Sequence, residues 1–310
     1  MSGINYINVA EFIEKKSRAG NFLKEKYVLL PFYKDGVPLT GKKWGMTLLS
    51  APSMRFRWNE KNEERTKLLK SIIAENCKSV CSGACASDFQ KCDCKHKIAG
   101  IELIHSKTVF SIKSEEDCLN KKGDGLVTDN SLLVPVVTVA DCVPLFLYDS
   151  QKGVSGAVHS GWKGTGIIRN AIQTAVEEYG SKPEDICVAI GPHICSRCYC
   201  VDEERRNYFL ENFGECVRKS EKCESEFQKT KEGRLLNYEL SLTDANLYAI
   251  KQAGIPEENI TVATDCTCCT TFSNGKNVYG SFRRQAAFLP DSVDDETRKK
   301  SMTVQAAFVL

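Results

Sequence analysis

The chain has 310 residues, of which 42% are hydrophobic and 26% charged, and this balance excludes a disordered, collagen-like or coiled-coil protein. Its 42 Lys and Arg residues against 40 Asp and Glu residues give a formal net charge of +2, too small for a broad attraction to nucleic acid or to an anionic membrane. No apolar run approaches the roughly 18 residues of a membrane span, and residues 1–15 lack the apolar core of a signal peptide. We therefore expect a cytoplasmic protein whose 16 cysteines are thiols or metal ligands rather than disulfides.

The predicted elements alternate between helices and strands. Apolar residues at helical spacing predict helices over 62–75 and 167–179, and Ser241 followed by Asp244 resembles a capping box for a later helix that ends near Gly254. Short β-branched runs predict strands at 132–138, 144–148, 154–158, 186–190 and 260–264. The first three strands leave almost no room for crossover helices, so the sheet must be at least partly antiparallel. Because no Pro/Gly/Ser-rich linker divides the chain, we expect a single α/β domain over residues 1–310.

Three side chains that could bind a metal lie near the ends of predicted strands. Cys142 lies between two apolar runs, His159 between a strand and the Gly-rich start of a helix, and His105 after the apolar run 101–104. Two imidazoles and one thiolate suit Zn²⁺, and three protein ligands leave a fourth position for water or substrate. The separations of 37 and 17 residues are not those of zinc fingers. A buried structural cysteine with two hydrogen-bonded histidines is therefore the alternative interpretation.

Several linked motifs carry a resemblance to a known family. They are Thr138-Val-Ala-Asp-Cys-Val-Pro144, His159-Ser-Gly-Trp-Lys-Gly-Thr165, Ala189-Ile-Gly-Pro192, Cys266-Thr267 and Ser281-Phe-Arg-Arg284. Their order resembles the laccase-domain family, whose members were formerly regarded as multicopper polyphenol oxidoreductases and are now associated with purine nucleoside phosphorylase activity. The resemblance runs from about Gly20 to about Arg284. It implies one α/β domain with mixed sheets layered with helices, here with a Cys-rich insertion at about 77–96.

The resemblance also implies a reaction and a metal. Zinc would be held by His105, Cys142 and His159, and the enzyme would convert inosine, guanosine or adenosine plus phosphate to free base plus ribose 1-phosphate. Adenosine deamination and methylthioadenosine cleavage are the companion activities that the family implies. Copper is less expected, because a multicopper oxidase needs many histidine ligands and this chain has four.

Phosphorolysis requires an anion site and a way to stabilise the leaving base. Lys163, Arg283 and Arg284 are the candidate phosphate ligands, although the family usually has Arg in place of Lys163. His193, which follows a predicted strand, could line the pocket. The Thr-Gly-Arg sequence that the family has after Arg284 is missing, so we expect one substrate contact of the family to be absent here.

Asp141 and Cys142 are neighbours in the sequence and candidates for catalysis together with His159. Asp141 could move a proton or orient a ligand histidine. Adjacent residues on a strand point to opposite faces, so Asp141 and Cys142 can share a pocket only if the chain turns there.

Two other functions remain open. In a metal-free hydrolase, Cys142 would be the nucleophile and His159 its base, acting on amide bonds such as those of cell-wall precursor peptides. A non-catalytic zinc-binding interaction module is the other alternative.

The remaining cysteines form groups. One comprises Cys77, Cys81, Cys85, Cys92 and Cys94, close to His96, and could hold a second metal. Cys195 and Cys198 form a C-x-x-C pair, and Cys266, Cys268 and Cys269 form another group. Structural thiols and a composite zinc or iron–sulfur site are both open for all of these groups.

Overall fold

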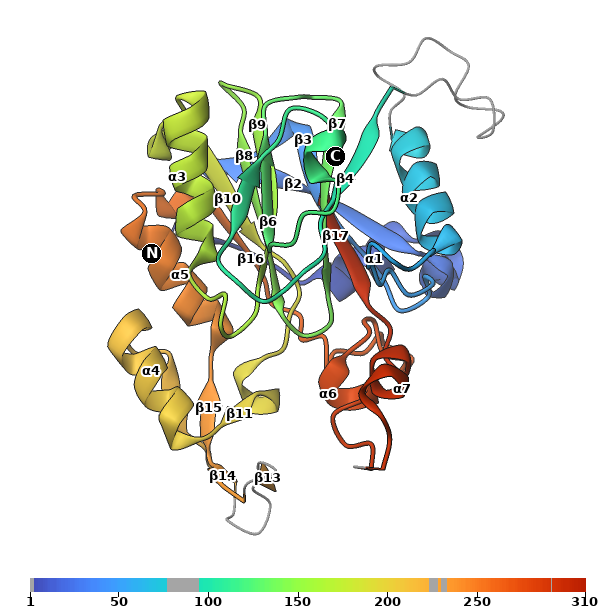
Figure 1. Ribbon diagram of the computed structural model, residues 1–310, viewed down its shortest axis with the longest axis vertical. Helices are drawn as coiled ribbons and strands as arrows, with labels where there is room; N and C mark the ends of the chain where they lie inside the picture. The colour runs from blue at the N-terminus through green and yellow to red at the C-terminus, as the bar shows by residue number, and fades with distance from the viewer. Residues whose placement is uncertain (1–2, 77–94, 223–227, 230–232, 291) are drawn as a thin grey trace.

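Two mixed β-sheets pack face to face, with helices on their outer faces (Figure 1). The computed structural model describes residues 3–76, 95–222, 228–229, 233–290 and 292–310. In spatial order, the seven-stranded sheet consists of β1 (Asn5–Ile7), β16 (Ile260–Ala263), β10 (Ile186–Ile190), β8 (Val143–Asp149), β9 (Val154–Ser160), β6 (Gly125–Thr128) and β5 (Val109–Ser111). The five-stranded sheet consists of β2 (Tyr27–Lys34), β3 (Val37–Thr47), β17 (Gln305–Val309), β7 (Leu133–Val139) and β4 (Lys97–Gly100).

Smaller elements surround these sheets. The helices are α1 (Val9–Lys16), α2 (Glu63–Asn76), α3 (Ile167–Tyr179), α4 (Glu203–Phe213), α5 (Leu242–Gln252), α6 (Phe282–Gln285) and α7 (Asp295–Lys300). Strands β11 (Cys200–Val201), β15 (Tyr238–Leu240) and β12 (Val217–Lys219) form a small sheet, and β13 (Gln228–Lys229) pairs with β14 (Leu235–Leu236). Among the described residues, no helix has the length and apolar character needed to cross a bilayer.

Strand β8 shows why the sheet sequences are continuously apolar. Its residues are buried on both faces, because successive side chains of a strand point to opposite sides. Leu145 and Leu147 pack into the core that β8 shares with α3 and α5. Phe146 and Tyr148 pack into the core between the two sheets. The apolar residues of β8 therefore contribute to two separate cores, one on each face of the sheet.

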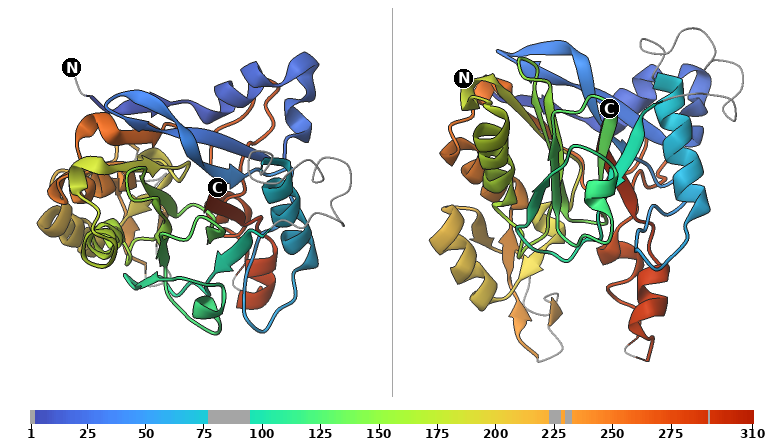
Figure 2. Two further views of the ribbon diagram at one scale, coloured as in Figure 1. Left: turned by 90° about the horizontal axis from the view of Figure 1, so that it is seen from above. Right: turned by 45° about the horizontal axis from the view of Figure 1, so that its top comes forward.

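Helix α2 covers the outer face of the five-stranded sheet. Its Leu69 and Ile72 pack with Val134 and Val136 of β7. Helices α3 and α5 lie on the opposite side of the molecule, as Figure 2 shows from two further directions. The layers are therefore helix, sheet, sheet and helix, and the shared core between the sheets makes them one unit.

The expected mixed α/β fold is confirmed. Strand β8 pairs antiparallel with β9 and β10, whereas β10 pairs parallel with β16. The three expected helices are α2, α3 and α5. The side chain of Ser241 accepts the Asp244 N–H, and Gly254 follows α5 with a φ of +83°, as expected at the end of a helix.

Two expectations about strand ends are wrong. Residues 101–104 form no strand, apart from a single bridge between Glu102 and Lys122, and the strand there is β4, which ends at Gly100. His159 lies within β9 rather than after it, because β9 continues to Ser160. The Cys-rich group from Cys77 to Cys94 lies outside the described residues.

Candidate active site

The three candidate metal ligands converge. The ligand atoms of His105, Cys142 and His159 all lie within 4.8 Å of one another. The two imidazole rings have centroids 4.8 Å apart and are nearly perpendicular, at 88°. Cys142 immediately precedes β8 and His159 is near the end of the antiparallel neighbour β9, so both lie at the same edge of the sheet. His105 comes from the irregular segment after β4.

Two unusual backbone conformations direct these side chains. His105 has a φ of +59° and Asp141 a φ of +81°, in the left-handed region that non-glycine residues rarely adopt. The chain therefore turns between β7 and β8, and this turn allows the neighbours Asp141 and Cys142 to face the same cavity. Both residues line the cavity described below.

Asp141 stabilises this turn. Its carboxylate accepts hydrogen bonds from Thr267 Oγ1 at 2.7 Å, Ser281 Oγ at 3.0 Å and the Arg283 N–H at 2.6 Å. These bonds tie the turn to the segments around residues 267 and 281–283. The carboxylate that contacts a ligand histidine is a different one, Asp124.

Asp124 is a site residue that sequence reasoning missed. It is completely buried and accepts the Nδ1–H of His159 at 2.9 Å and the backbone N–H of His105 at 3.0 Å. It also accepts the N–H and Oγ–H of Ser106, at 2.6 and 2.7 Å. One carboxylate thus orients two candidate ligands, and the bond to Nδ1 leaves Nε2 of His159 for a metal. Its position between Gly123 and Gly125 is the sequence signal that could have pointed to it.

The electrostatics of the site favour a thiolate. Burial alone would raise the pKa of Cys142, but the His159 and His105 imidazoles outweigh it and lower this pKa to about 6. Burial likewise opposes the charge of His159, but Cys142 and Asp124 raise its pKa to about 9. A thiolate is the form of cysteine that binds metals and attacks electrophiles.

Gly161 leaves the space in which these ligands meet. A Cβ at this position would lie 3.0 Å from His105 Cδ2, 3.3 Å from Cys142 Sγ and 3.4 Å from His159 Cε1. The Gly161→Ala variant is therefore expected to bind Zn²⁺ about tenfold more weakly, because the side chains of His105 and Cys142 must shift by a few tenths of an ångström. Competition with a chelating dye measures this affinity.

The matched control for that prediction is Gly100→Ala. A Cβ at Gly100 would approach Arg65 Nη2 to 3.3 Å, but it would touch none of the three ligands. This control should keep the wild-type zinc affinity. Equal affinities for Gly161→Ala and the wild type would refute the role assigned to Gly161.

A cavity of about 500 Å³ opens beside the three ligands, within the size range of small-molecule sites. Besides the ligands and Asp141, its wall includes aromatic and apolar side chains, among them Trp162, Ile194, Tyr199, Leu242 and Phe282. It also includes the basic side chains Arg55, Arg57, Arg205, Arg283 and Lys299. The cavity thus combines flat apolar surface with positive charge.

A larger cavity of about 930 Å³ lies between α2 and β4. His96 lines it, but none of His105, Cys142 and His159 does. The candidate chemistry is therefore in the smaller cavity.

Of the expected anion ligands, only Arg283 lines the cavity. Lys163 lies outside it, with Nζ over the Trp162 ring at 5.4 Å from the centroid. The guanidinium of Arg284 donates to the backbone carbonyls of Thr267, Cys268 and Tyr279 and so fixes the fold of that segment.

The expected role of His193 in the pocket is not supported. Its Nδ1 donates to the Gly191 carbonyl at 2.8 Å, and its Nε2 pairs with Thr243 Oγ1 at 2.8 Å. The ring is buried outside the cavity, and this burial lowers its pKa. Both nitrogens are thus used in holding the loop after β10 to the start of α5.

Arg205 is the second site residue that sequence reasoning missed. Its guanidinium lies over the Trp162 ring, 4.3 Å from the centroid, and its buried Nε has no hydrogen-bond partner among the described residues. Nothing in the charged run 203–206 distinguishes it from its neighbours.

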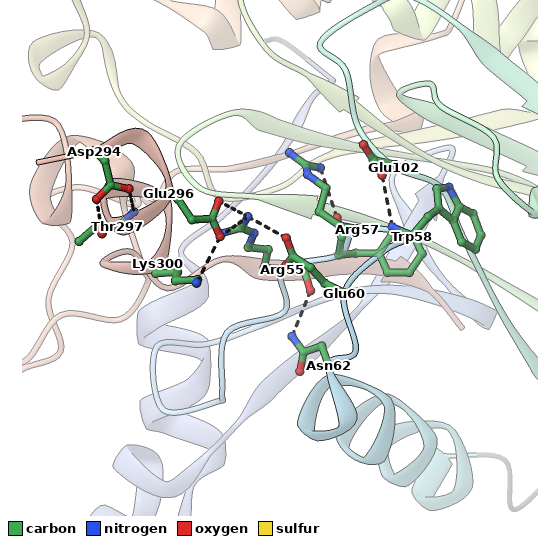
Figure 3. A network of polar contacts seen from close by, with 11 residues as sticks. Arg55, Arg57, Trp58, Glu60, Asn62, Glu102, Asp294, Glu296, Thr297 and Lys300 are labelled. Atoms are coloured by element: carbon green, nitrogen blue, oxygen red, sulfur yellow. Dashed lines mark hydrogen bonds and ion pairs between the residues drawn. The ribbon is translucent and has the colours of Figure 1, made fainter.

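Arg55 differs from Arg205, because its charge is balanced. Its Nη2 lies 3.0 Å from Glu60 Oε1 and 3.1 Å from Glu296 Oε2. Figure 3 shows Arg55 between these two carboxylates. These bonds tie the segment after residue 55 to α7.

The chain is similar to several known proteins. A protein of Clostridium acetobutylicum described as a purine nucleoside phosphorylase is 42% identical over 111 residues, which are 35% of this chain and 46% of that protein. A protein of an unknown prokaryotic organism described as adenosine deaminase RL5 is 30% identical over 170 residues, 53% of this chain and 60% of that protein. The chain thus spans about half the length of the curated relatives it matches.

The solved structure of YlmD from Geobacillus stearothermophilus has the same fold, with a TM-score of 0.63 and 21% identity over 90% of this chain and 95% of that one. The fold and the site together define a mixed α/β protein in which two histidines and one cysteine form a candidate metal-binding group. Residues 73–288 match the model of the family described as multi-copper polyphenol oxidoreductase laccase, and the chain belongs to this family.

Proposed function

We propose that this protein is a zinc-dependent purine nucleoside phosphorylase. The observation that carries the proposal is the His105–Cys142–His159 group beside a cavity with aromatic walls and arginine side chains. The name of the Clostridium acetobutylicum relative supports phosphorolysis, and the name adenosine deaminase RL5 supports a purine nucleoside as the substrate. The substrates would be a purine nucleoside such as inosine, guanosine or adenosine, and inorganic phosphate.

The residues present fit one zinc ion. A thiolate and two imidazoles are a borderline-soft donor set, Gly161 leaves space among them, and Asp124 orients His159. A zinc ion held there would supply Lewis acidity to the reaction. A cluster of copper ions fits less well, because His193 uses both ring nitrogens elsewhere and His96 lines the other cavity.

The chain's own residues would bind and orient the two substrates. The flat side chains of Trp162, Tyr199 and Phe282 suit the faces of a purine. Arg205 and Arg283 would hold phosphate through charge-assisted hydrogen bonds. A phosphate oxygen then bonds to C1′ of the ribose as the N-glycosidic bond breaks, and the proton of the phosphate ends on the purine. Asp141 would act as a positioning residue, through the turn that presents Cys142.

Arg205 and Lys163 are expected to behave differently. The Arg205→Ala variant should lower kcat/KM for phosphate about 100-fold, because a charged hydrogen bond to a desolvated anion is lost. The Lys163→Ala variant should keep the wild-type value, since Lys163 lies outside the cavity. The measurement is the initial rate of base release against phosphate concentration at saturating inosine.

Arg206→Ala is the matched control for Arg205→Ala. Arg206 is the next residue of α4, and its guanidinium lies over the Tyr238 ring at 5.0 Å from the centroid instead of in the cavity. We expect this variant to keep the wild-type kcat/KM. An Arg205→Ala enzyme with unchanged phosphate dependence would eliminate Arg205 as a phosphate ligand.

The test of the function itself is incubation of the zinc-loaded protein with inosine, guanosine or adenosine, with and without phosphate. Phosphorolysis releases free base and ribose 1-phosphate only when phosphate is present. Inosine formed from adenosine without phosphate would show deamination, and methylthioadenosine tests the companion cleavage. Absence of base release from every nucleoside would reject the proposal and leave the two alternatives, a Cys/His hydrolase and a zinc-binding interaction module.

A Cys/His hydrolase is the second candidate, and the lowered pKa of Cys142 favours it. This enzyme would cleave amide or ester substrates without phosphate after removal of the metal. A covalent intermediate on Cys142, detected by mass spectrometry, would identify it.

A further inference from the structure

Four cysteines from two distant segments meet outside the cavity. Their ligand atoms all lie within 4.8 Å of one another, and the cysteines are Cys195, Cys198, Cys266 and Cys269. Each segment contributes a C-x-x-C pair, the spacing of structural zinc sites. The 67 residues between the pairs hide this relationship in the sequence, and only folding brings the pairs together.

The backbone holds the two pairs in register. His193 and Cys266 form a parallel bridge, and the Thr267 N–H donates to the His193 carbonyl at 3.0 Å. The Cys195 N–H donates to the sulfur of Cys266 at 3.2 Å. Around the second pair, the Cys266 N–H donates to Thr270 Oγ1 at 2.8 Å, and the Cys266 carbonyl accepts the Thr270 N–H at 3.0 Å. These backbone bonds fix two turns, and the turns direct the four sulfurs toward one point.

The spacing of the sulfurs indicates a single ion. Around a tetrahedral zinc with Zn–S bonds of about 2.3 Å, the sulfurs lie about 3.8 Å apart. The four sulfurs of this protein lie at most 4.8 Å apart, so only a small inward movement would bring them to the distances found around zinc. Four cysteines around an iron–sulfur cluster must stand farther apart, because the cluster's own iron and sulfide atoms fill the space between them.

We propose that Cys195, Cys198, Cys266 and Cys269 bind a second zinc ion, at a closed structural site separate from the three-ligand site. All four coordination positions are taken by protein sulfurs, so no position remains for a substrate. Its role is to support the cavity. Ile194 and Tyr199, which line the cavity, flank the first pair, and Thr267, between the cysteines of the second pair, donates to Asp141.

The first experiment isolates this site in the Cys142→Ala background, in which the three-ligand site has lost its thiolate. Zinc per chain is measured by elemental analysis after dialysis under reducing conditions. We expect the zinc content of Cys142→Ala to fall by one ion per chain when Cys269→Ser is added. Because Cys269 is exposed, its replacement should leave the core intact.

Cys200→Ser is the matched control, since Cys200 lies two residues after Cys198 but is not in the four-sulfur group. In the same Cys142→Ala background it should leave the zinc content unchanged. Equal zinc contents with and without Cys269→Ser would overturn the proposal, as would a disulfide between any two of the four cysteines in the protein purified under reducing conditions.

A second experiment uses the unaltered chain and so avoids any doubt about folding. The metal-free, reduced protein is treated with iodoacetamide with and without added Zn²⁺, and the modified cysteines are mapped by mass spectrometry. Zinc should protect the exposed Cys269 from alkylation, and equal labelling would count against the site. Neither experiment reads out nucleoside cleavage, so failure of this proposal and failure of the phosphorylase proposal are distinguishable.

Discussion

Replacing Cys142 by alanine is expected to lower phosphate-dependent base release by about 10³-fold, the effect of losing strong electrostatic stabilisation at a reacting centre. The Cys142 thiolate is the only anionic ligand of the three-ligand group, and Gly161, beside it, offers no donor side chain to replace it. The same variant should lose the zinc of this site. Zinc content and the rate of hypoxanthine release from inosine are measured on the same preparation.

Cys187→Ala is the control for this prediction. Cys187 is also buried on the seven-stranded sheet, but burial raises the pKa of its thiol to about 12 and it packs in the core between the sheets. Its replacement should lower stability slightly and leave zinc and turnover unchanged. Full turnover by Cys142→Ala enzyme that contains no zinc would show that the metal assignment is wrong.

The second large effect is expected for Asp124→Asn. The shape is kept, but an amide N–H₂ replaces one of the oxygens that accept from His159, His105 and Ser106. Because a carboxylate behind a ligand histidine fixes its tautomer and orientation, zinc affinity or turnover should fall about 10- to 100-fold. Chelator competition and nucleoside cleavage measure the two quantities.

Asp149→Asn is a matched control, because Asp149 is an equally buried carboxylate that accepts backbone N–H groups from Gln151 at 2.8 Å and Lys152 at 3.1 Å. It lies at the far end of β8 from Cys142. This variant should be less stable but bind zinc normally. If both variants lost zinc equally, the effect of Asp124→Asn would be one of general stability.

The sequence predicts much of the fold because local patterns decide it. β-Branched runs locate β7 to β10 and β16 within one or two residues, and short connections correctly predict antiparallel pairing. The stacking of two sheets depends on which strands of distant origin share a core, and no local pattern shows that. The central position of β17 in its sheet is an example.

The site is predictable in part, for a similar reason. The sequence predicts His105, Cys142 and His159 as ligands, and these three side chains do meet. For His193 the sequence is misleading, because residue type does not show whether ring nitrogens are already paired. Asp124 and Arg205 escape prediction because their roles depend on a buried contact to His159 and on stacking over Trp162, respectively.

Strand β17 follows every other described strand in the sequence, yet it lies between β3 and β7, with Ala307 opposite both Met46 and Val137. Until β17 leaves the ribosome, these two neighbours have no common partner and their unpaired edges face each other across an open slot. The five-stranded sheet must therefore close only after residues 305–309 have been translated. A nascent chain that stalls before residue 305 would expose two unpaired strand edges, to which chaperones or other copies of the chain could bind.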